Sequence, residues 1–209
     1  MEKIFKNNSL SLFLGKKQTG KSFMMKYLLY TASKRNRFDY VIIISPTSFN
    51  GDWDVIPESF IYQTMDDAFL ENLFEIQKNN NSSLLLILDD TIGTVKHDSP
   101  KFQTLATSGR HFRISVFASF QHYKKAPTFL RSNAENIFVF KQHNQLIVEN
   151  MFFEWGFGNF KTKHEFMEYI RKNTQNYNVV YIDVNNDKFF VVRAKDVGKF
   201  YLEFGSTNE

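Results

Sequence analysis

The sequence predicts an α/β fold in which helices flank a mainly parallel central sheet and a C-terminal antiparallel hairpin extends it. Short apolar segments rich in β-branched residues alternate along the chain with longer segments of helical periodicity. Strands that are apolar on both faces are typical of parallel sheets covered by helices on both sides. Near the C-terminus, two apolar strand-like segments are separated by only a few polar residues, which is typical of a hairpin.

The first half of the chain supplies three of the predicted strands and two of the helices. Ser9–Leu14 is a short apolar strand, and Lys21–Arg35 follows it with apolar residues spaced four apart on one helix face. Tyr40–Ile44 is a β-branched run that ends at a Ser-Pro turn, and it predicts a buried strand. After an irregular loop, Asp66–Gln77 is helical with Asp66 as its cap, and Leu84–Leu88 is another buried strand.

The second half of the chain continues the alternation. Ile114–Ser119 and Asn136–Phe140 are apolar strands, and we expect a helix between them. The segment NVVYIDVNNDKFFVVRA reads as two strands joined by a turn at 185–187, added to an edge of the sheet. The sequence contains no repeats and no long linker, so we expect one domain over residues 1–209.

Composition limits the classes of protein that need to be considered. The chain has 209 residues, of which 43% are apolar and 23% charged, as in ordinary globular proteins. It has no Cys, which excludes disulfides and thiolate metal sites. We expect no signal peptide, because the start of the chain lacks a long apolar h-region and a small-residue cleavage site. We expect no transmembrane helix, because no apolar run approaches about 18 residues. The net charge of +4 permits nucleic-acid binding without requiring it.

The segment GKKQTGKS, Gly15–Ser22, lies between the first predicted strand and the first predicted helix. It matches the P-loop pattern G-x-x-x-x-G-K-[ST], in which glycines let the backbone curl until its N–H groups point at phosphates. The helix dipole adds positive charge, Lys21 reaches the terminal phosphates, and the Ser22 hydroxyl ligates Mg²⁺. We expect a nucleotide to be bound by Gly15, Lys16, Lys17, Gln18, Thr19, Gly20, Lys21, Ser22 and Phe23.

A second motif, LLLILDD, ends in two acids and has the Walker B pattern. Asp89, at the carboxyl end of its strand, is expected to hold Mg²⁺ through water, across from Ser22. Asp90 is then placed to orient or deprotonate the attacking water, although related ATPases more often carry Glu there. Gln121 follows the next strand and would reach the γ-phosphate or that water if its strand lies between those of the P-loop and Asp89.

The combination of FLGKKQTGKS, VIIISPTS, LLLILDD, SGRHFRISVFASFQ and LRSNAENIFVFK resembles the genome-packaging ATPases of poxvirus-type viruses, related large DNA viruses and virophages. These ATPases belong to the FtsK–HerA superfamily of P-loop NTPases. The resemblance spans about residues 9–141, and the C-terminal hairpin is also similar. It implies an ATP- and Mg²⁺-dependent ring, pentameric or hexameric, that drives double-stranded DNA into a preformed capsid at a vertex. The corresponding location is the virus factory in the host cytoplasm, or the virion.

A ring motor of this kind needs a positive group supplied by a neighbouring subunit to stabilise charge on the transferring phosphoryl group. A guanidinium suits this role because it stays charged and donates in a planar fork. The candidates are Arg110 and Arg113 in GRHFR, and Arg131 in LRSN.

Loops that face the pore of a ring would carry cations for DNA phosphates. The segment TIGTVKHDSPK follows the Walker B motif and contains Lys96 and Lys101. The segment HYKK contains Lys124 and Lys125 and is a second candidate. The sequence contains no base-reading module, as expected if DNA is moved irrespective of its sequence.

Two other functions stay open at this point. A P-loop nucleotide or nucleoside kinase would need an Arg-rich lid and an acceptor-binding acid, and neither can be placed in the sequence. An ATP-binding module without turnover is favoured only by Asp90 in the position where Glu is more frequent. A GTPase is disfavoured because the guanine-recognition motif N-K-x-D does not occur.

Overall fold

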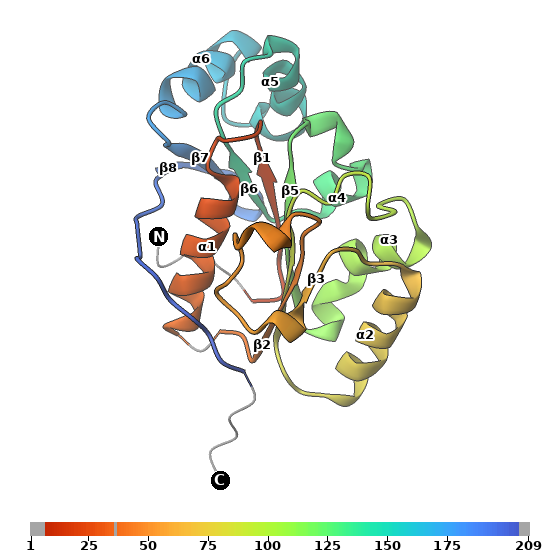
Figure 1. The fold of residues 1–209 in the computed structure, drawn as a ribbon. Coiled ribbons are helices and arrows are strands. Elements are labelled where there is room, and N and C mark those ends of the chain that lie inside the picture. The colour runs from red at the N-terminus through yellow and green to blue at the C-terminus, as the bar shows by residue number, and fades with distance from the viewer. Residues whose placement is uncertain (1–6, 36, 205–209) are drawn as a thin grey trace.

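The computed structural model describes residues 7–35 and 37–204, and within them one eight-stranded sheet runs in the order β3-β2-β4-β5-β1-β6-β7-β8 (Figure 1). The first six strands of this order are mutually parallel. β7 runs antiparallel to β6, and β8 runs antiparallel to β7. The strands are β1 Leu10–Leu14, β2 Tyr40–Ile44, β3 Ile61–Tyr62, β4 Leu84–Leu88, β5 Ile114–Phe120, β6 Asn136–Val139, β7 Val179–Asp183 and β8 Lys188–Val192. The predicted fold class, including the C-terminal hairpin at the sheet edge, is confirmed.

Helices cover both faces of the sheet, as continuous apolar strands require. One face is covered by α1 together with the segment after β2 and the C-terminal segment, and the other by the remaining helices (Figure 1). The helices are α1 Lys21–Ser33, α2 Asp67–Asn79, α3 Pro100–Ser108, α4 Thr128–Asn133, α5 Gln145–Met151 and α6 Lys163–Asn173, with a π-helical turn at Phe152–Gly156.

The strand order places the candidate residues together. β5 lies between β1 and β4, which is the arrangement that the role of Gln121 requires. Because these three strands are parallel, their carboxyl ends meet at one edge of the sheet. Three aromatic rings hold the strands beneath that edge. Phe13 of β1 stacks on Phe138 of β6 at 4.6 Å and meets Phe117 of β5 edge-on at 5.2 Å.

Two segments differ from the sequence-based expectation. The segment predicted as an irregular loop after β2 contains the short strand β3. Part of the predicted loop TIGTVKHDSPK is helical, because Ser99 caps α3 by accepting a hydrogen bond from the Phe102 N–H and Pro100 occupies the first turn. Lys101 therefore lies on a helix and not on a loop.

Two further expectations concern membranes and export. No helix in residues 7–35 and 37–204 is long and apolar enough to cross a membrane. The expectation that the chain starts without a signal peptide concerns a segment that lies partly outside the described residues.

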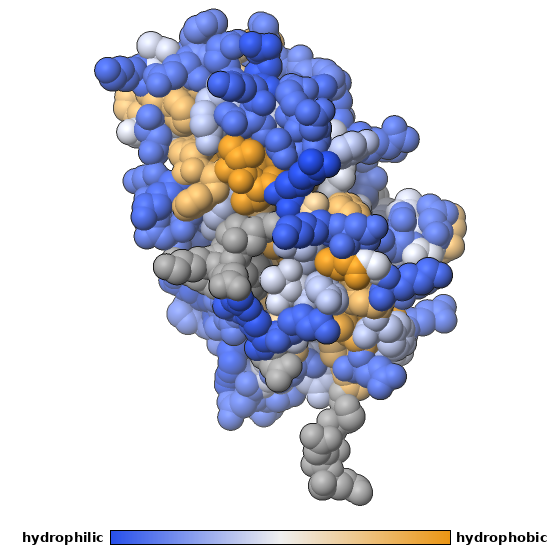
Figure 2. Space-filling view, turned by 90° about the vertical axis from the view of Figure 1, so that its left-hand side faces the viewer, coloured by the Kyte–Doolittle hydropathy of each residue, from blue (hydrophilic) through white to orange (hydrophobic). Residues whose placement is uncertain are grey.

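On the side of the molecule that carries β8, apolar side chains gather among hydrophilic ones (Figure 2), and the exposed large apolar residues of β8 are Phe190 and Val191.

Candidate active site

The turn between β1 and α1 is shaped by two glycines with different roles. A Cβ added at Gly15 would lie 2.5 Å from the Cβ of Phe140 and 2.8 Å from the Thr19 hydroxyl, so only glycine fits there. Gly20 has φ +93, a left-handed conformation that glycine adopts without strain, and it immediately precedes α1. The turn thus has the backbone form that a phosphate cradle needs.

Lys21 lies inside this turn, with only 8% of its surface exposed. Its ammonium donates hydrogen bonds to the carbonyl oxygens of Gly15, at 2.8 Å, and Lys16, at 2.9 Å. Burial lowers the pKa of Lys21, and the nearby charges of Asp89 and Asp90 oppose that shift. The side chain is therefore held over the turn, where a phosphate would take the place of the carbonyl oxygens.

The Asp89 carboxylate, at the end of β4, is 6% exposed and accepts hydrogen bonds from three other parts of the chain. Ser22 of α1 donates to Oδ2 at 2.8 Å, and the Trp53 indole donates to the same oxygen at 3.1 Å. Ser119 of β5 donates to Oδ1 at 2.8 Å. A buried carboxylate needs such donors to offset its lost hydration.

Trp53 and Ser119 are part of the candidate site, and the sequence analysis did not identify them. Ser119 is a polar residue inside an otherwise apolar strand, and this is the signal that could have singled it out. Trp53 belongs to the irregular segment after β2, and no local pattern there points to the site. Its side chain is fully buried, and Lys26 of α1 lies over its ring at 5.7 Å.

The donor set around Ser22 and Asp89 fits Mg²⁺. A hydroxyl and a carboxylate are hard oxygen ligands, and they lie within 2.8 Å of each other. Mg²⁺ usually takes one or two carboxylates together with phosphate oxygens and waters, so it needs no all-protein cage. Among the described residues, no group of three or more His, Cys, Asp or Glu is placed to hold a metal ion.

Asp90 and Gln121 lie side by side at the same edge. The Gln121 amide donates to the Asp90 carboxylate, and the Asp90 backbone N–H donates to Ser119 at 3.0 Å. Asp90 has φ 54, a left-handed conformation that costs energy for a residue other than glycine. This turn directs the carboxylate away from β4 and towards the end of β5.

The loop after Asp90 is anchored by a histidine. His97 shares a hydrogen bond of 3.0 Å with the Thr91 hydroxyl, and its ring lies 5.0 Å from that of Phe102 and 5.4 Å from that of Phe120. Burial lowers the pKa of His97 to about 4, with a smaller opposing effect from Asp98. The imidazole is therefore neutral at pH 7.

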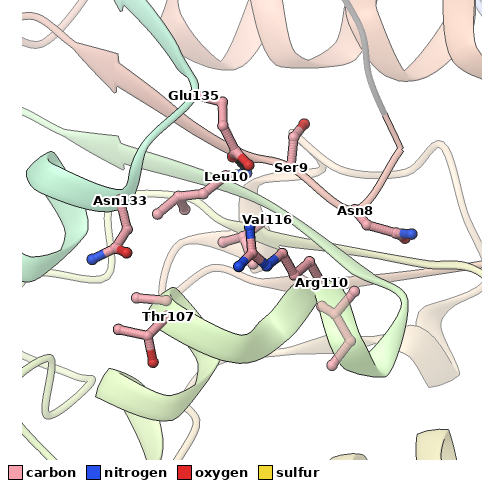
Figure 3. Close-up of a pocket in the computed structure, with 10 residues that line it drawn as sticks. Asn8, Ser9, Leu10, Thr107, Arg110, Val116, Asn133 and Glu135 are labelled. Atoms are coloured by element: carbon pink, nitrogen blue, oxygen red, sulfur yellow. Dashed lines mark hydrogen bonds between the residues drawn. The ribbon is translucent and has the colours of Figure 1, made fainter. Parts of the chain in front are cut away.

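Arg110 lies just before β5 begins, at the end of the strands opposite to the P-loop. It is exposed and lines a small pocket with Leu10, Asn133 and Glu135, into which its side chain points (Figure 3). The carboxylate of Glu135 accepts a hydrogen bond from the Leu10 N–H at 2.6 Å. Within the described part of the chain, Arg110 has no ion pair.

The other two arginines are engaged within their own chain. Arg131 is 15% exposed, donates to both carboxylate oxygens of Glu154 at 3.1 and 3.0 Å, and lies 4.6 Å from the centre of the Tyr123 ring. Arg113 donates to the side chain of Asn81. The structure thus brings neither of them to the P-loop of its own chain.

The candidate DNA-binding lysines differ in their surroundings. Lys96 is exposed in the loop that leaves β4, and Lys124 and Lys125 are exposed in a 3-10 turn, Tyr123–Lys125, that follows β5. These three lie on segments that leave the same sheet edge as the P-loop. Lys101 pairs with Glu71 of α2 at 2.7 Å, so its charge is already partly neutralised.

The strand order and the turn after β1 define a P-loop NTPase fold. The chain belongs to the poxvirus A32 protein family, whose pattern matches residues 2–196.

The chain is also similar in sequence to two viral proteins. The uncharacterized protein 075L of Invertebrate iridescent virus 6 is 28% identical over 197 residues, covering 90% of this chain and 72% of that protein. The uncharacterized protein 015R of Frog virus 3 is 26% identical over 180 residues, covering 81% and 55%.

Among solved structures, the genome packaging NTPase B204 from Sulfolobus turreted icosahedral virus 2, in complex with ATP-gammaS, superposes with a TM-score of 0.69. It is 17% identical, and the match covers 91% of this chain and 100% of that one. The DNA-packaging ATPase B204 from Sulfolobus Turreted Icosahedral Virus gives a TM-score of 0.67 at 16% identity, covering 92% and 100%. At these identities the likeness establishes the fold.

Replacing Trp53 with Phe tests whether its indole N–H orients the Asp89 carboxylate, the candidate Mg²⁺ ligand. W53F keeps an aromatic ring in the core but removes the donor to Asp89. We expect the Mg²⁺ concentration needed for half-maximal ATP binding to rise about tenfold or more, as for other residues that support metal ligands. W155F, which changes the other, distant Trp, is the matched control. An unchanged Mg²⁺ requirement in W53F would show that the hydrogen bond does not matter.

Replacing His97 with Gln tests the burial of the imidazole. An unfolded His titrates near pH 6.5, whereas His97 titrates at about 4 in the folded chain. Between these values the unfolded state binds the extra proton, so the free energy of unfolding decreases as pH falls. In urea titrations across this window, H97Q should lose less stability than wild type as the pH is lowered. Equal slopes for H97Q and wild type would contradict the assignment.

Proposed function

We propose that this chain is a viral genome-packaging ATPase, which hydrolyses ATP with Mg²⁺ and couples hydrolysis to the movement of double-stranded DNA into a preformed capsid. The observation that carries the proposal is the network centred on Asp89, which joins Ser22 of the P-loop helix to Ser119 of β5. Membership of the poxvirus A32 protein family supports it, as does the fold shared with B204, a genome packaging NTPase that binds ATP-gammaS.

In this proposal each site residue has a defined task. The backbone N–H groups of residues 15–23 and the Lys21 ammonium bind the phosphates. Ser22 and Asp89 hold Mg²⁺, which supplies positive charge to the phosphate oxygens. Asp90 accepts the proton of the attacking water, and Gln121, which already donates to Asp90, orients that water.

We further propose that residues 1–209 act as a single ATPase domain in a pentameric or hexameric ring at the capsid vertex, in the virus factory of the host cytoplasm or in the virion. Arg110 is our candidate for the arginine that acts on the neighbouring subunit's nucleotide, because it is exposed and unpaired in the described chain. Arg131 is a weaker candidate, since Glu154 and Tyr123 already engage it. Lys96, Lys124 and Lys125 would contact DNA phosphates.

The proposal predicts ATP turnover that depends on DNA and on assembly. Phosphate release should rise when double-stranded DNA is added, and it should rise more than linearly with protein concentration. In K21A, which removes the cation that contacts the terminal phosphates, turnover should fall by at least about a hundredfold. Turnover that is linear in protein and indifferent to DNA would contradict a ring motor. Transfer of phosphate to added nucleosides would identify a kinase instead.

Mixing two inactive variants tests whether Arg110 acts between subunits. R110A keeps an intact P-loop, and K21A keeps an intact Arg110. We expect each variant to be inactive alone and a mixture to recover part of the wild-type turnover, because some interfaces then pair a working P-loop with a working arginine. R113A, changed in the same turn, is the matched control and should stay active. A mixture that remains inactive would exclude this role for Arg110.

A further inference from the structure

Three side chains, Tyr123, Arg131 and Glu154, form a cluster that holds the turn after β5, at the sheet edge that carries the P-loop. Tyr123 is buried, and its hydroxyl donates a hydrogen bond to the carboxylate of Glu154. Arg131 of α4 donates from Nε to both oxygens of the same carboxylate, and its guanidinium lies over the Tyr123 ring. Each member of the cluster therefore contacts the other two.

The cluster joins three elements that are separate along the chain. Glu154 lies in the π-helical turn Phe152–Gly156, a rare form that is frequent at functional sites. The next residue of that turn, Trp155, meets the Tyr123 ring edge-on, with the ring centres 5.8 Å apart. Arg131 also donates to the Ala126 carbonyl. The turn after β5 is thus held by the π-helical turn at its first residue and by α4 just beyond its last.

The contacts within the cluster fix geometry more than they add stability. Arg131 and Glu154 are mostly buried, and the hydration that two charges lose on burial offsets much of their attraction. A guanidinium that donates to both oxygens of a carboxylate nevertheless sets the distance and the angle between them. Burial and the hydrogen bond to Glu154 raise the pKa of Tyr123, so its hydroxyl stays protonated and remains a donor at neutral pH.

The turn lies between two groups that have tasks in the proposed function. Gln121, two residues before Tyr123, donates to Asp90 and would orient the attacking water. Lys124 and Lys125 follow Tyr123 directly, are exposed, and would contact DNA phosphates. One short segment thus carries a group for hydrolysis at one end and cations for DNA at the other, with a buried aromatic ring between them.

We infer that Arg131 and Glu154 are positioning residues, which act through the Tyr123 ring that they hold. They fix Gln121 relative to the two lysines of the turn, so that DNA bound at the lysines accelerates hydrolysis. This inference rests on the proposed function and extends it, because it assigns the packed side chains through which DNA affects the attacking water. Without the cluster, the lysines would still bind DNA, but the turn would deform and Gln121 would not respond.

Phosphate release by the full chain, with and without saturating double-stranded DNA, tests the inference. The protein concentration is one at which turnover per chain no longer rises. Glu154→Ala removes the acceptor that Tyr123 and Arg131 share. It should lower the ratio of turnover with DNA to turnover without DNA by about fivefold or more, a usual size for coupling between two sites. The DNA concentration for half-maximal turnover should stay as in wild type, because the lysines are unchanged.

The ratio does not depend on the fraction of the protein that is folded, so a merely structural role would leave it unchanged. Glu149→Ala is the matched control. It breaks an ion pair between Glu149 of the neighbouring helix α5 and Lys163, which has no contact with the turn, and it should keep the wild-type ratio.

Tyr123→Phe is a second variant, which decides the question if Glu154→Ala does not fold. It keeps the ring and its contacts with Trp155 and Arg131, and it loses only the hydroxyl that donates to Glu154. Its ratio should fall by about twofold or more, since one of the contacts that carry the coupling is lost.

The outcomes distinguish a failure of this inference from a failure of the proposed function. A wild-type ratio in Glu154→Ala, or in Tyr123→Phe where that variant decides, would overturn the positioning role and leave the ATPase assignment standing. A higher DNA requirement with an unchanged ratio would also overturn it, because the cluster would then shape only the DNA contact. If turnover of the wild type is indifferent to DNA, the proposed motor fails, and the coupling fails with it.

Discussion

The buried carboxylate of Asp89 is the constraint on which the rest of the site depends. An ionised group that is withdrawn from water must be compensated by hydrogen bonds or paired charge. Here the donors come from α1, from β5 and from the segment after β2, through Ser22, Ser119 and Trp53. Three parts of the chain that are distant in sequence are thereby fixed relative to one carboxylate, and Lys21 is held in the turn beside it.

The sheet makes this arrangement possible because its strands cannot slide independently. Phe13 packs against both Phe117 and Phe138 beneath the carboxyl ends of β1, β5 and β6. A shift of one residue in any of these strands would turn its ring to the other face of the sheet. The register therefore determines which side chains reach the edge: the P-loop after β1, Asp89 after β4 and Gln121 after β5.

The C-terminal part of the chain is integrated with the same region. The Leu202 N–H donates to the Val55 carbonyl at 2.8 Å, so this segment is joined to the stretch that carries Trp53. Arg193 and Asp196, earlier in the same segment, line a cavity beside Gly20. The C-terminal segment thus contacts both the stretch that carries Trp53 and the surroundings of the P-loop.

Local patterns alone predicted the fold class, the P-loop turn, Asp89, the cap at Asp66 and the C-terminal hairpin, because periodicity, glycine placement and turn residues act over a few neighbouring positions. Tertiary structure alone decided that Trp53 and Ser119 donate to Asp89, since they lie 36 and 30 residues away along the chain. It likewise decided that Arg131 pairs with Glu154 while Arg110 stays exposed. Such pairings depend on which elements pack together, and a pattern of neighbouring residues carries no information about that.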